Sequence, residues 1–505
     1  MFADIHVHPT MKYLQNGLTD LWEPFGRGFD IKNIINKVIG IPAFSQTDFR
    51  TMAEAGVQLV ICNLHPAEQK TVFSELFGSD LDRTLEHLAG QTASIPSERI
   101  DEEFQAPTYN HFDDLMAEYE LLLKCSGNNG VAQFVDIGGK PIKCSYWIVH
   151  NFKEVQQIIE RNQKNERHHL IAVLIAIEGL HALGRGHVNF PDAQGTPIPN
   201  PFNLTDAAFL DRVDFIKGVN GALEFPPFSI NLTHVFANSI CGHAQGLSIF
   251  FQALFDYAEP WGPRFGTQTR ENLNIDFTDF GKQVLLRLLG IDEVSKQRRQ
   301  SQQHAGERIL IDIKHMSVRA RLSYYDIIDQ HNAANPDDII PIFMSHAAVN
   351  GKPRLADELD PTDLQEEYEA SEGFNPWSIN LYDDELIRIH QTQGIIGLII
   401  DQRILAGGKK LKSLRGRLDD NQVTNFPQHE FFQNSSKKRK WARLLVDQIH
   451  HIVSTIAADP TLSEESKLTA WDCIALGTDF DGQIDPIGPY CTSCDFSKLR
   501  RVLRS

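Results

Sequence analysis

Residues 170–179 read LIAVLIAIEG, a run of apolar residues that ends in a single carboxylate, Glu178. A continuous apolar run rich in β-branched residues is typical of a strand buried on both faces, as in a parallel sheet. The carboxylate has to be paired, protonated or bound to a metal, because burying an unpaired charge costs free energy. The stretch therefore predicts a parallel strand that presents an acidic group at its carboxyl end.

Similar short apolar runs recur along the chain and bring the predicted strands to eight. In order they are Phe2–Ile5, Val57–Cys62, Ile171–Ile177, Phe228–Leu232, Ile309–Ile313, Ile340–Met344, Ile395–Ile400 and Cys473–Leu476. Helical periodicity follows most of them, for example in Phe152–Arg161, Phe277–Leu289, Asp384–Gln391 and Lys440–Ala457. Strands that alternate with helices imply right-handed βαβ units and a parallel sheet. Eight such units favour an α/β fold of the closed (β/α)8, or TIM-barrel, type. Periodicity alone also allows an open, doubly wound sheet.

The chain has 505 residues, which is long for a barrel of ~250 residues, but barrels grow beyond ~400 residues by insertion. We therefore expect a single barrel domain over residues 1–505. Its long insertions are expected near residues 80–150, 235–308, 355–378 and 402–440.

Composition argues against a nucleic-acid-binding, membrane-spanning or disulfide-rich protein. The net charge of −18 makes nucleic acid an unfavourable partner. The sequence contains no run of ~20 apolar residues, so we expect no membrane span. The N-terminus does not resemble a secretory signal. Seven cysteines, an odd number, argue against a disulfide framework and favour a reducing compartment, the cytoplasm. The single CxxC at Cys491 and Cys494 is a weak zinc signal, and two unrelated thiols is the simpler interpretation.

A titratable side chain stands at or just after the end of every predicted strand. In a β/α barrel these ends converge on one face, which holds the active site. In chain order the residues are His6 with His8, His65, Glu178, His234, His315, His346, Asp401 and Asp479.

Part of this set has the chemistry of a metal centre. His6 and His8, at positions i and i+2 of a strand, point to the same face and can hold one ion. Together with Glu178, His315 and His346 they form a nitrogen-rich set that suits Zn²⁺. Glu178 could bridge two divalent ions that share a nucleophilic water. The alternatives are a salt-bridged structural glutamate and histidines satisfied in the core.

Two further residues have the chemistry of catalysis. Asp479, in ALGTDFDG, could orient a water, take its proton and pass it to a leaving amine, and the flanking glycines allow a close backbone approach. Asp481 is the rival for this role. His234 could donate to the oxyanion of a tetrahedral intermediate, although a capping or core histidine is an equal interpretation.

The pattern resembles the renal (membrane) dipeptidase family of the amidohydrolase superfamily. The matching segments occur in the family's order: DIHVHP, IAIEGLHALG, INLTH, FTDFGKQVLLRLLG, LIDIKHMSV, PIFMSHAAV, LYDDELIRIHQTQGIIGLIID and IALGTDFDG. The resemblance implies a (β/α)8 barrel with a binuclear zinc site that hydrolyses dipeptides.

The same resemblance assigns roles to single residues. His6 corresponds to the first metal ligand, Glu178 to the bridging carboxylate, and His315 and His346 to the ligands of the second ion. Asp479 corresponds to the general acid/base, and His234 to the residue that contacts the scissile group. Arg354 falls near the arginine with which the family grips the substrate carboxylate.

The chain departs from the family in three places. His8 stands where the family has aspartate, which changes the charge of the site by one unit. Lys314 stands where the family has a small polar residue, and strand alternation predicts that it points away from the site. The family continues through a longer C-terminal helical segment, so either the last helix is short or the chain is truncated.

The expected function is a zinc-dependent dipeptidase, a metallopeptidase with a small-molecule substrate. Another amidohydrolase reaction on the same scaffold is the alternative, as an N-acyl amino acid amidase, deacetylase or lactonase. A non-catalytic metal-binding barrel is the third hypothesis, and Asp479 argues against it. The long insertions could serve as a lid or as the interface of a homodimer.

Overall fold

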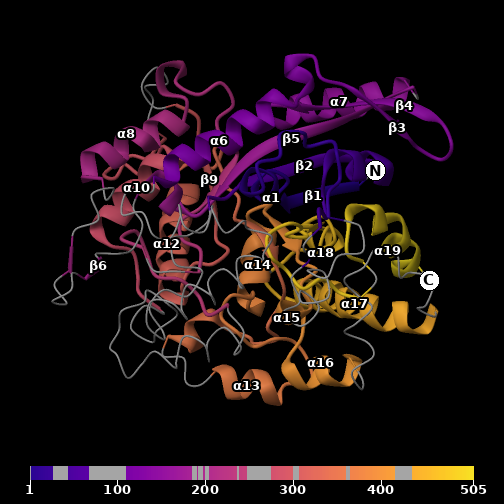
Figure 1. Ribbon diagram of the computed structural model, residues 1–505. Helices are drawn as coiled ribbons and strands as arrows, with labels where there is room; N and C mark the ends of the chain where they lie inside the picture. The colour runs from indigo at the N-terminus through magenta and orange to yellow at the C-terminus, as the bar shows by residue number, and fades with distance from the viewer. Residues whose placement is uncertain are drawn as a thin grey trace.

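A closed barrel of eight parallel strands forms the centre of the molecule (Figure 1). Its strands are β1 (Phe2–Val7), β2 (Val57–Leu64), β5 (His168–Glu178), β8 (Ser229–Asn231), β9 (Leu310–Asp312), β10 (Phe343–Ala347), β11 (Ile395–Leu398) and β12 (Ile474–Leu476). The computed structural model describes residues 2–26, 42, 44–66, 110–165, 167–184, 190–191, 197–198, 204–235, 238–246, 274–298, 306–359, 364–415, 435–488 and 490–504.

Strand pairing closes the barrel. The hydrogen-bonded order β2-β1-β12-β11-β10-β9-β8-β5 becomes a ring because β2 also pairs with β5, from Leu59 opposite Ala172 to Leu64 opposite Ile177. Each of the eight apolar runs forms one of these strands, so the predicted barrel is confirmed and the open sheet is excluded. The runs form strands because both of their faces are covered, one by barrel side chains and the other by helices.

The helices lie where the sequence places them, and polar side chains fix their starts. The predicted helices are α7 (Phe152–Lys164), α10 (Asp279–Leu289), α14 (Asp383–Gln391) and α17 (Ser435–Ala458). The Asn151 side chain accepts a hydrogen bond from the Glu154 backbone N–H at the start of α7. Thr278 does the same for Gly281 at the start of α10. Such caps satisfy backbone donors that a helix cannot pair internally.

Other described helices cover the barrel or connect its strands. They are α1 (Met11–Gln15), α3 (Phe49–Ala55), α6 (His111–Lys124), α8 (Asp206–Ile216), α12 (Val318–Ala334), α13 (Leu364–Ala370), α15 (Gln402–Leu405), α16 (Gly408–Arg415), α18 (Glu464–Leu468) and α19 (Phe496–Leu503). The short 3-10 helices are η1 (Gly127–Asn129), η2 (Leu180–Leu183), η3 (Val219–Gly221), η5 (Leu355–Glu358) and η7 (Ser493–Asp495).

A hairpin extends the sheet beyond the barrel, and the sequence analysis did not predict it. β3 (Gln133–Asp136) pairs antiparallel with β4 (Pro141–Ile148), and β4 pairs parallel with the first half of β5. In Figure 1 the hairpin projects beside α7 at the edge of the molecule. A separate two-stranded sheet joins β6 (Phe190–Pro191) and β7 (Pro197–Ile198).

The expected insertions are described in part. Residues 80–109, 247–273 and 416–434 lie outside the described residues. Within the first insertion, α6 packs close to η2, which directly follows β5. This contact brings a helix of the insertion to the carboxyl end of the barrel.

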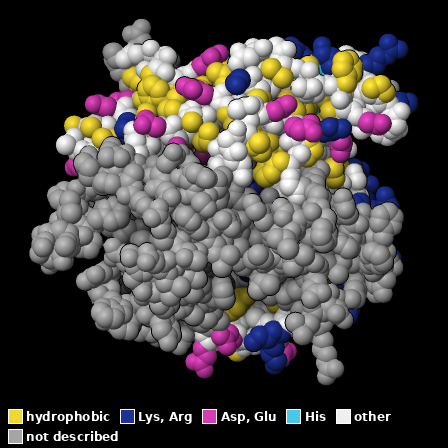
Figure 2. Space-filling view, in the orientation of Figure 1, with side chains coloured by type: hydrophobic (Ala, Val, Ile, Leu, Met, Phe, Trp, Pro, Cys, Tyr) yellow, Lys and Arg dark blue, Asp and Glu magenta, His cyan; other side chains and the backbone are white. Residues whose placement is uncertain are grey.

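The described surface carries side chains of mixed type. On the described part of the face in Figure 2, hydrophobic, acidic and basic side chains are intermixed. None of the described helices is long and apolar enough to cross a membrane. All seven cysteines are free, and the Cys491 and Cys494 thiols contact backbone carbonyls of Gly488 and Thr51.

Candidate metal centre

Two histidines from β1 begin the site. His6 lies within β1 and His8 directly after it, and their Nε2 atoms are 3.1 Å apart. Both side chains are fully buried. The shared direction expected from their i, i+2 spacing is therefore present, and the two nitrogens face one point.

Glu178, the last residue of β5, lies at the centre of the cluster. Its Oε1 is 3.2 Å from His315 Nε2, 3.5 Å from His346 Nε2 and 3.6 Å from His6 Nε2. Its Oε2 is 3.2 Å from His8 Nε2. Oε1 thus faces the imidazoles of His6, His315 and His346, and Oε2 faces that of His8. A carboxylate with imidazoles at both oxygens is suited to contact two ions.

Asp479 lies at the edge of this cluster, after β12. Its Oδ1 is 3.2 Å from His8 Nε2 and 3.8 Å from His6 Nε2. Its side chain keeps 13% of its surface exposed, whereas the His6 and His8 side chains keep none. Asp479 is therefore the carboxylate of the cluster that combines contact with the histidines and access from outside.

Asp481 has a different environment, which removes it as the rival of Asp479. It is buried, its Oδ1 lies 2.9 Å from Lys12 Nζ, and it accepts hydrogen bonds from the backbone N–H groups of Gln46 and Thr47. The oxygens of this carboxylate are therefore already occupied by a cation and two amides. Asp481 therefore anchors the loop after β1 to the loop after β12.

The electrostatics of the cluster are dominated by burial and by a few short contacts. Burial raises the pKa of Glu178, but His234, His6 and His315 outweigh it and hold that pKa well below its usual range. Burial lowers the pKa of His315 and His346 far below the usual value, so both rings are neutral. Burial also lowers the pKa of His8, but hydrogen bonds to Asp479 and Glu178 outweigh it and raise the pKa to about 10.

Backbone conformation at the site is unusual. His315 and Asp479 have φ values of +69° and +60°, in the left-handed region that few non-glycine residues adopt. Such conformations cost free energy and tend to cluster at functional sites. Here they turn the chain sharply at the ends of β9 and β12 and direct both side chains into the barrel mouth.

His234 and His65 also lie close to Glu178. His234 Nε2 is 3.9 Å from Glu178 Oε1, and its side chain is 18% exposed. His65 Nδ1 donates to the Glu178 carbonyl oxygen at 2.9 Å, and the His65 ring packs edge-on against that of His234. The sequence analysis noted His65 after the second strand but gave it no role, because one histidine after a strand is not a specific signal.

Lys314 lies beyond the end of its strand. Strand alternation predicts that it points away from the site, but β9 ends at Asp312 and the chain turns at His315. Lys314 is buried, and the charges of Asp479, Asp312 and Glu178 act on its ammonium group. Burial lowers its pKa to about 8 against the opposing effect of these carboxylates. The ammonium group is thus part of the electrostatic environment of the cluster.

Arg354 and Asp401 are not part of the cluster. Arg354 precedes η5 on the surface, and its guanidinium makes no hydrogen bond or ion pair with the residues that the structure describes. Asp401, after β11, caps α15 and accepts hydrogen bonds from the Arg403 side chain at 3.0 Å. Asp401 is therefore a structural residue.

The cluster fits a metal centre by its chemistry. Three groups within it bring their ligand atoms within 4.8 Å of one another: His6, Glu178 and His346; His6, His8 and Asp479; and His65, Glu178 and His234. Converging imidazoles and carboxylates are the usual ligands of zinc. Ser345 Oγ lies 2.8 Å from His346 Nδ1 and can accept a hydrogen bond from an N–H at that position. In that tautomer the Nε2 lone pair is available to bind an ion.

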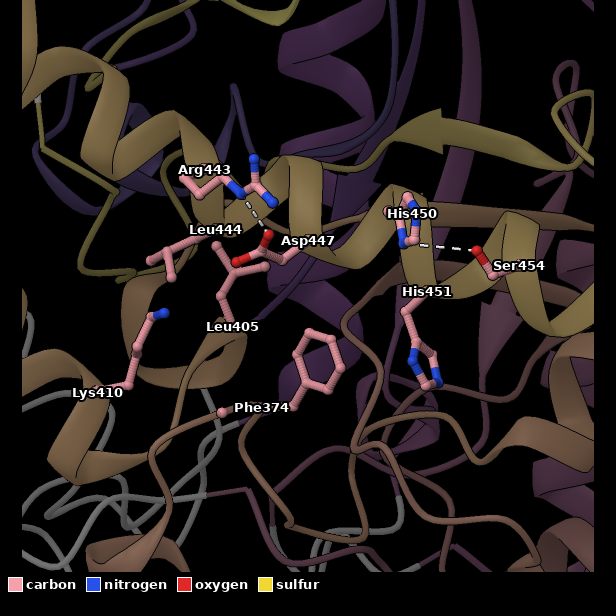
Figure 3. A pocket seen from close by; sticks show the side chains of 10 residues that line it. Phe374, Leu405, Lys410, Arg443, Leu444, Asp447, His450, His451 and Ser454 are labelled. Atoms are coloured by element: carbon pink, nitrogen blue, oxygen red, sulfur yellow. Dashed lines mark hydrogen bonds and ion pairs between the residues drawn. The ribbon is translucent and has the colours of Figure 1, made fainter.

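A separate cavity of about 480 Å³ lies along α17. Figure 3 shows Arg443, bonded to Asp447, on one side of it, with Lys410, Leu405 and Phe374 opposite. None of its lining residues belongs to the metal cluster, so this cavity is not the candidate active site.

Comparison with known proteins gives weak similarities. No protein-family model matches the chain, and no curated protein matches it. Among solved structures, dipeptidase AC, a metallopeptidase of family M19, matches with a TM-score of 0.44 and 10% identity over 100% of this chain and 91% of its own.

Two other solved structures give similar values. A metallopeptidase from Rhodobacter sphaeroides, bound to a phosphinate mimic of the dipeptide L-Ala-D-Ala, has a TM-score of 0.44 and 10% identity over 100% of this chain and 92% of its own. A probable dipeptidase, PvdM, from Pseudomonas aeruginosa has a TM-score of 0.41 and 12% identity over 91% of this chain and 84% of its own. These values are too low to assign an activity, and the barrel fold rests on the strand pairing described above.

Proposed function

We propose that the chain is a metal-dependent hydrolase, and specifically a dipeptidase that uses zinc. The observation that carries the proposal is the convergence of four histidines and two carboxylates at the carboxyl end of the barrel, with Asp479 partly exposed beside them. A purely structural metal site closes all positions around its ion and has no use for an accessible carboxylate. The site therefore favours catalysis over a scaffold role.

The proposed ligands divide around Glu178. His6 and His8 would hold one divalent ion, His315 and His346 a second, and Glu178 would contact both. When bound, the two ions supply a water that ionises near neutral pH and polarise the carbonyl of the substrate.

The remaining roles belong to residues that face the substrate side. Asp479 would accept a proton from the attacking water and return it to the leaving amine. His234, which is partly exposed beside His315, would donate a hydrogen bond to the oxygen that becomes negative in the transition state. Arg354 is proposed to meet the free carboxylate of a dipeptide, because its exposed guanidinium has no ion-pair partner within the described part of the chain.

A second candidate is another amidohydrolase reaction on an N-acyl amino acid, an acetylated amine or a lactone. The observation that favours it is His8, an uncharged ligand where dipeptidases of the resembling family have aspartate. Loss of one negative charge beside the site alters which substrate charges are tolerated. The seven free thiols fit a reducing compartment, so we propose that the enzyme works in the cytoplasm.

The test is hydrolysis of a mixed panel of dipeptides and N-acyl amino acids by protein that is stripped of metal and reloaded with zinc. Zinc-dependent release of free amino acids from dipeptides is expected. In Asp479→Asn, turnover should fall by at least ~10²-fold with zinc retained, because a positioned acid/base contributes about that much. Asp472→Asn, on the exposed chain before β12, is the control and should keep full activity.

The outcomes separate the hypotheses. Hydrolysis of N-acyl amino acids but not of dipeptides would show that the protein is an amidase and not a dipeptidase. Unchanged turnover in Asp479→Asn would remove the acid/base role from this residue. Bound zinc without hydrolysis of any amide or ester would leave a non-catalytic metal-binding barrel.

A further inference from the structure

The cavity along α17 has the size of a small-molecule site and is separate from the metal cluster (Figure 3). Its volume is about 480 Å³, and pockets that hold small ligands usually measure roughly 300–1,000 Å³. Its described walls come from α15, α16, α17 and the turn at Gly373 and Phe374. A cavity of this size between several elements has room for an organic molecule.

Hydrogen bonds fix the wall that faces α17. Ser371 Oγ donates to the Phe374 carbonyl at 2.8 Å, and the Gly373 carbonyl accepts from the Gly407 N–H at 3.0 Å. The Lys410 N–H donates to the Ser371 carbonyl at 3.1 Å. The turn that carries Phe374 is therefore held against the start of α16.

α17 is fixed in its turn to the rest of the barrel. Gln448 Nε2 donates to the Leu405 carbonyl at 2.9 Å, and Gln448 Oε1 accepts from the Val349 N–H at 2.6 Å. His451 Nε2 lies 2.6 Å from Asp383 Oδ1, at the start of α14. Because both walls are held by hydrogen bonds, the cavity is preformed, and a ligand would bind without the cost of ordering it.

The lining carries more positive than negative groups. Lys410 and Arg443 are permanent cations, and the carboxylate of Asp447 accepts a hydrogen bond of 2.6 Å from Arg443 Nε. Lys409 pairs with Glu372, whereas the Lys410 ammonium has no ion-pair partner in the part of the chain that the structure describes. In a chain with a net charge of −18, this is a local site at which an anion is attracted.

Apolar side chains lie beside the free cation. Figure 3 shows Phe374 and Leu405 on the same side of the cavity as Lys410, and Leu444 on α17. The Phe374 ring packs edge-on against the His451 ring, with centroids 5.1 Å apart, so its position is defined. A ligand that contacts both kinds of group needs a negative end and an apolar body.

We propose that this cavity binds a small organic carboxylate with an aromatic or branched apolar body. The carboxylate contacts the Lys410 ammonium, and the apolar body packs against Phe374, Leu405 and Leu444. The inference does not rest on the proposed hydrolase, because no lining residue is a proposed metal ligand or catalytic residue.

The test is a calorimetric titration of the full chain with phenylacetate, which has both features. Saturable binding is expected, and 2-phenylethanol, which has the ring without the charge, should bind at least about tenfold more weakly, because hydrogen bonds between charged groups contribute this much. Lys410→Met should weaken phenylacetate binding by a similar factor. Lys412→Met, at an exposed position of the same helix that does not line the cavity, is the control and should keep the wild-type affinity.

The metal centre is the other place at which a carboxylate could bind, and Glu178→Gln separates the two sites. Phenylacetate binding that persists in Glu178→Gln and weakens in Lys410→Met would support the cavity. Binding that is lost in Glu178→Gln and unchanged in Lys410→Met would overturn the inference, and so would the absence of saturable binding to the wild type. Neither of these results would contradict the proposed hydrolase, which is tested by turnover.

Discussion

Asp479 and Asp481 stand two residues apart, both with positive φ, and their surroundings give them different tasks. Asp481 is enclosed by Lys12 and backbone amides, whereas Asp479 faces the histidines and keeps part of its surface exposed. The sequence alone left the two as rivals, because identical side chains differ in function through the groups around them. Gly482 follows them directly, and its lack of a Cβ leaves room for the Asp479 side chain.

A methyl group at Gly482 would displace Asp479. The added Cβ would come within 2.0 Å of Asp479 Oδ1 and 2.9 Å of His8 Cδ2. Gly482→Ala is therefore expected to lower kcat by about 100-fold, the effect of a ~1 Å misplacement of a catalytic group. Gly373→Ala, where an added Cβ has nothing within 4 Å, is the control for steady-state assays on the best substrate of the panel. Equal kcat values in the two variants would contradict the prediction.

At the scale of elements, α6 connects two strand ends through one buried carboxylate. Glu118 Oε2 accepts a hydrogen bond of 2.6 Å from the hydroxyl of Thr10, which lies two residues after His8. Glu118 Oε1 accepts from the His65 backbone N–H at 3.2 Å, and His65 in turn donates to the Glu178 carbonyl. Burial raises the pKa of Glu118 to about 7. A helix from an insertion thus fixes the loops that follow β1 and β2.

Removing this carboxylate should loosen both loops. In Glu118→Ala, the Thr10 hydroxyl and the His65 N–H lose their acceptor, and each buried unsatisfied group costs about 1–3 kcal/mol. We expect the free energy of unfolding to fall by this order in urea titrations. Glu118→Gln, which keeps an acceptor oxygen, should recover part of the loss, and Glu120→Ala on the exposed face of α6 should have little effect. Equal stability of the Glu118→Ala and Glu120→Ala variants would rule out the proposed connection.

At the scale of the whole molecule, the proposed metal ligands come from strands around the barrel. His6, Glu178 and His346 belong to β1, β5 and β10, which are not neighbours in the ring. Ions that share Glu178 as proposed would connect these strands across the barrel mouth. Binding to the folded state alone stabilises it by about 2.7 kcal/mol when free ligand is at 100 times Kd.

Chelation is therefore expected to lower the Tm of the wild-type protein by several degrees, and added zinc should restore it. Glu178→Gln loses the ligand common to both proposed ions, so its Tm should respond little to chelator or zinc. Calorimetry of both proteins with and without chelator measures the difference. A wild-type Tm that is insensitive to chelation would argue against a metal at this position.

The sequence predicted the barrel well because its strands are buried on both faces and therefore read as continuous apolar runs. It missed the β3–β4 hairpin because β3 has a single buried residue, Val135, among Gln133, Phe134 and Asp136. Alternation within a strand does not fix the direction of the Lys314 side chain, because β9 ends two residues earlier. The positions of His6, His8, Glu178, His315, His346 and Asp479 at strand ends were predictable, since barrel topology brings such ends together. The environment that separates Asp479 from Asp481 depends on Lys12 and Gln46, which are distant in sequence.

The pairing of β1 with β12, where Asp4 stands opposite Leu476, has a consequence for the life of the chain on the ribosome. The first strand to be synthesised has to wait for the last before the ring can close, and contacts this distant in sequence form late in folding. His6 is synthesised long before Asp479, yet they lie within 3.8 Å of each other. A nascent polypeptide can therefore contain several of the proposed ligands before they form a site. Binding of an ion at this site requires that all eight strands of the barrel have been synthesised and paired.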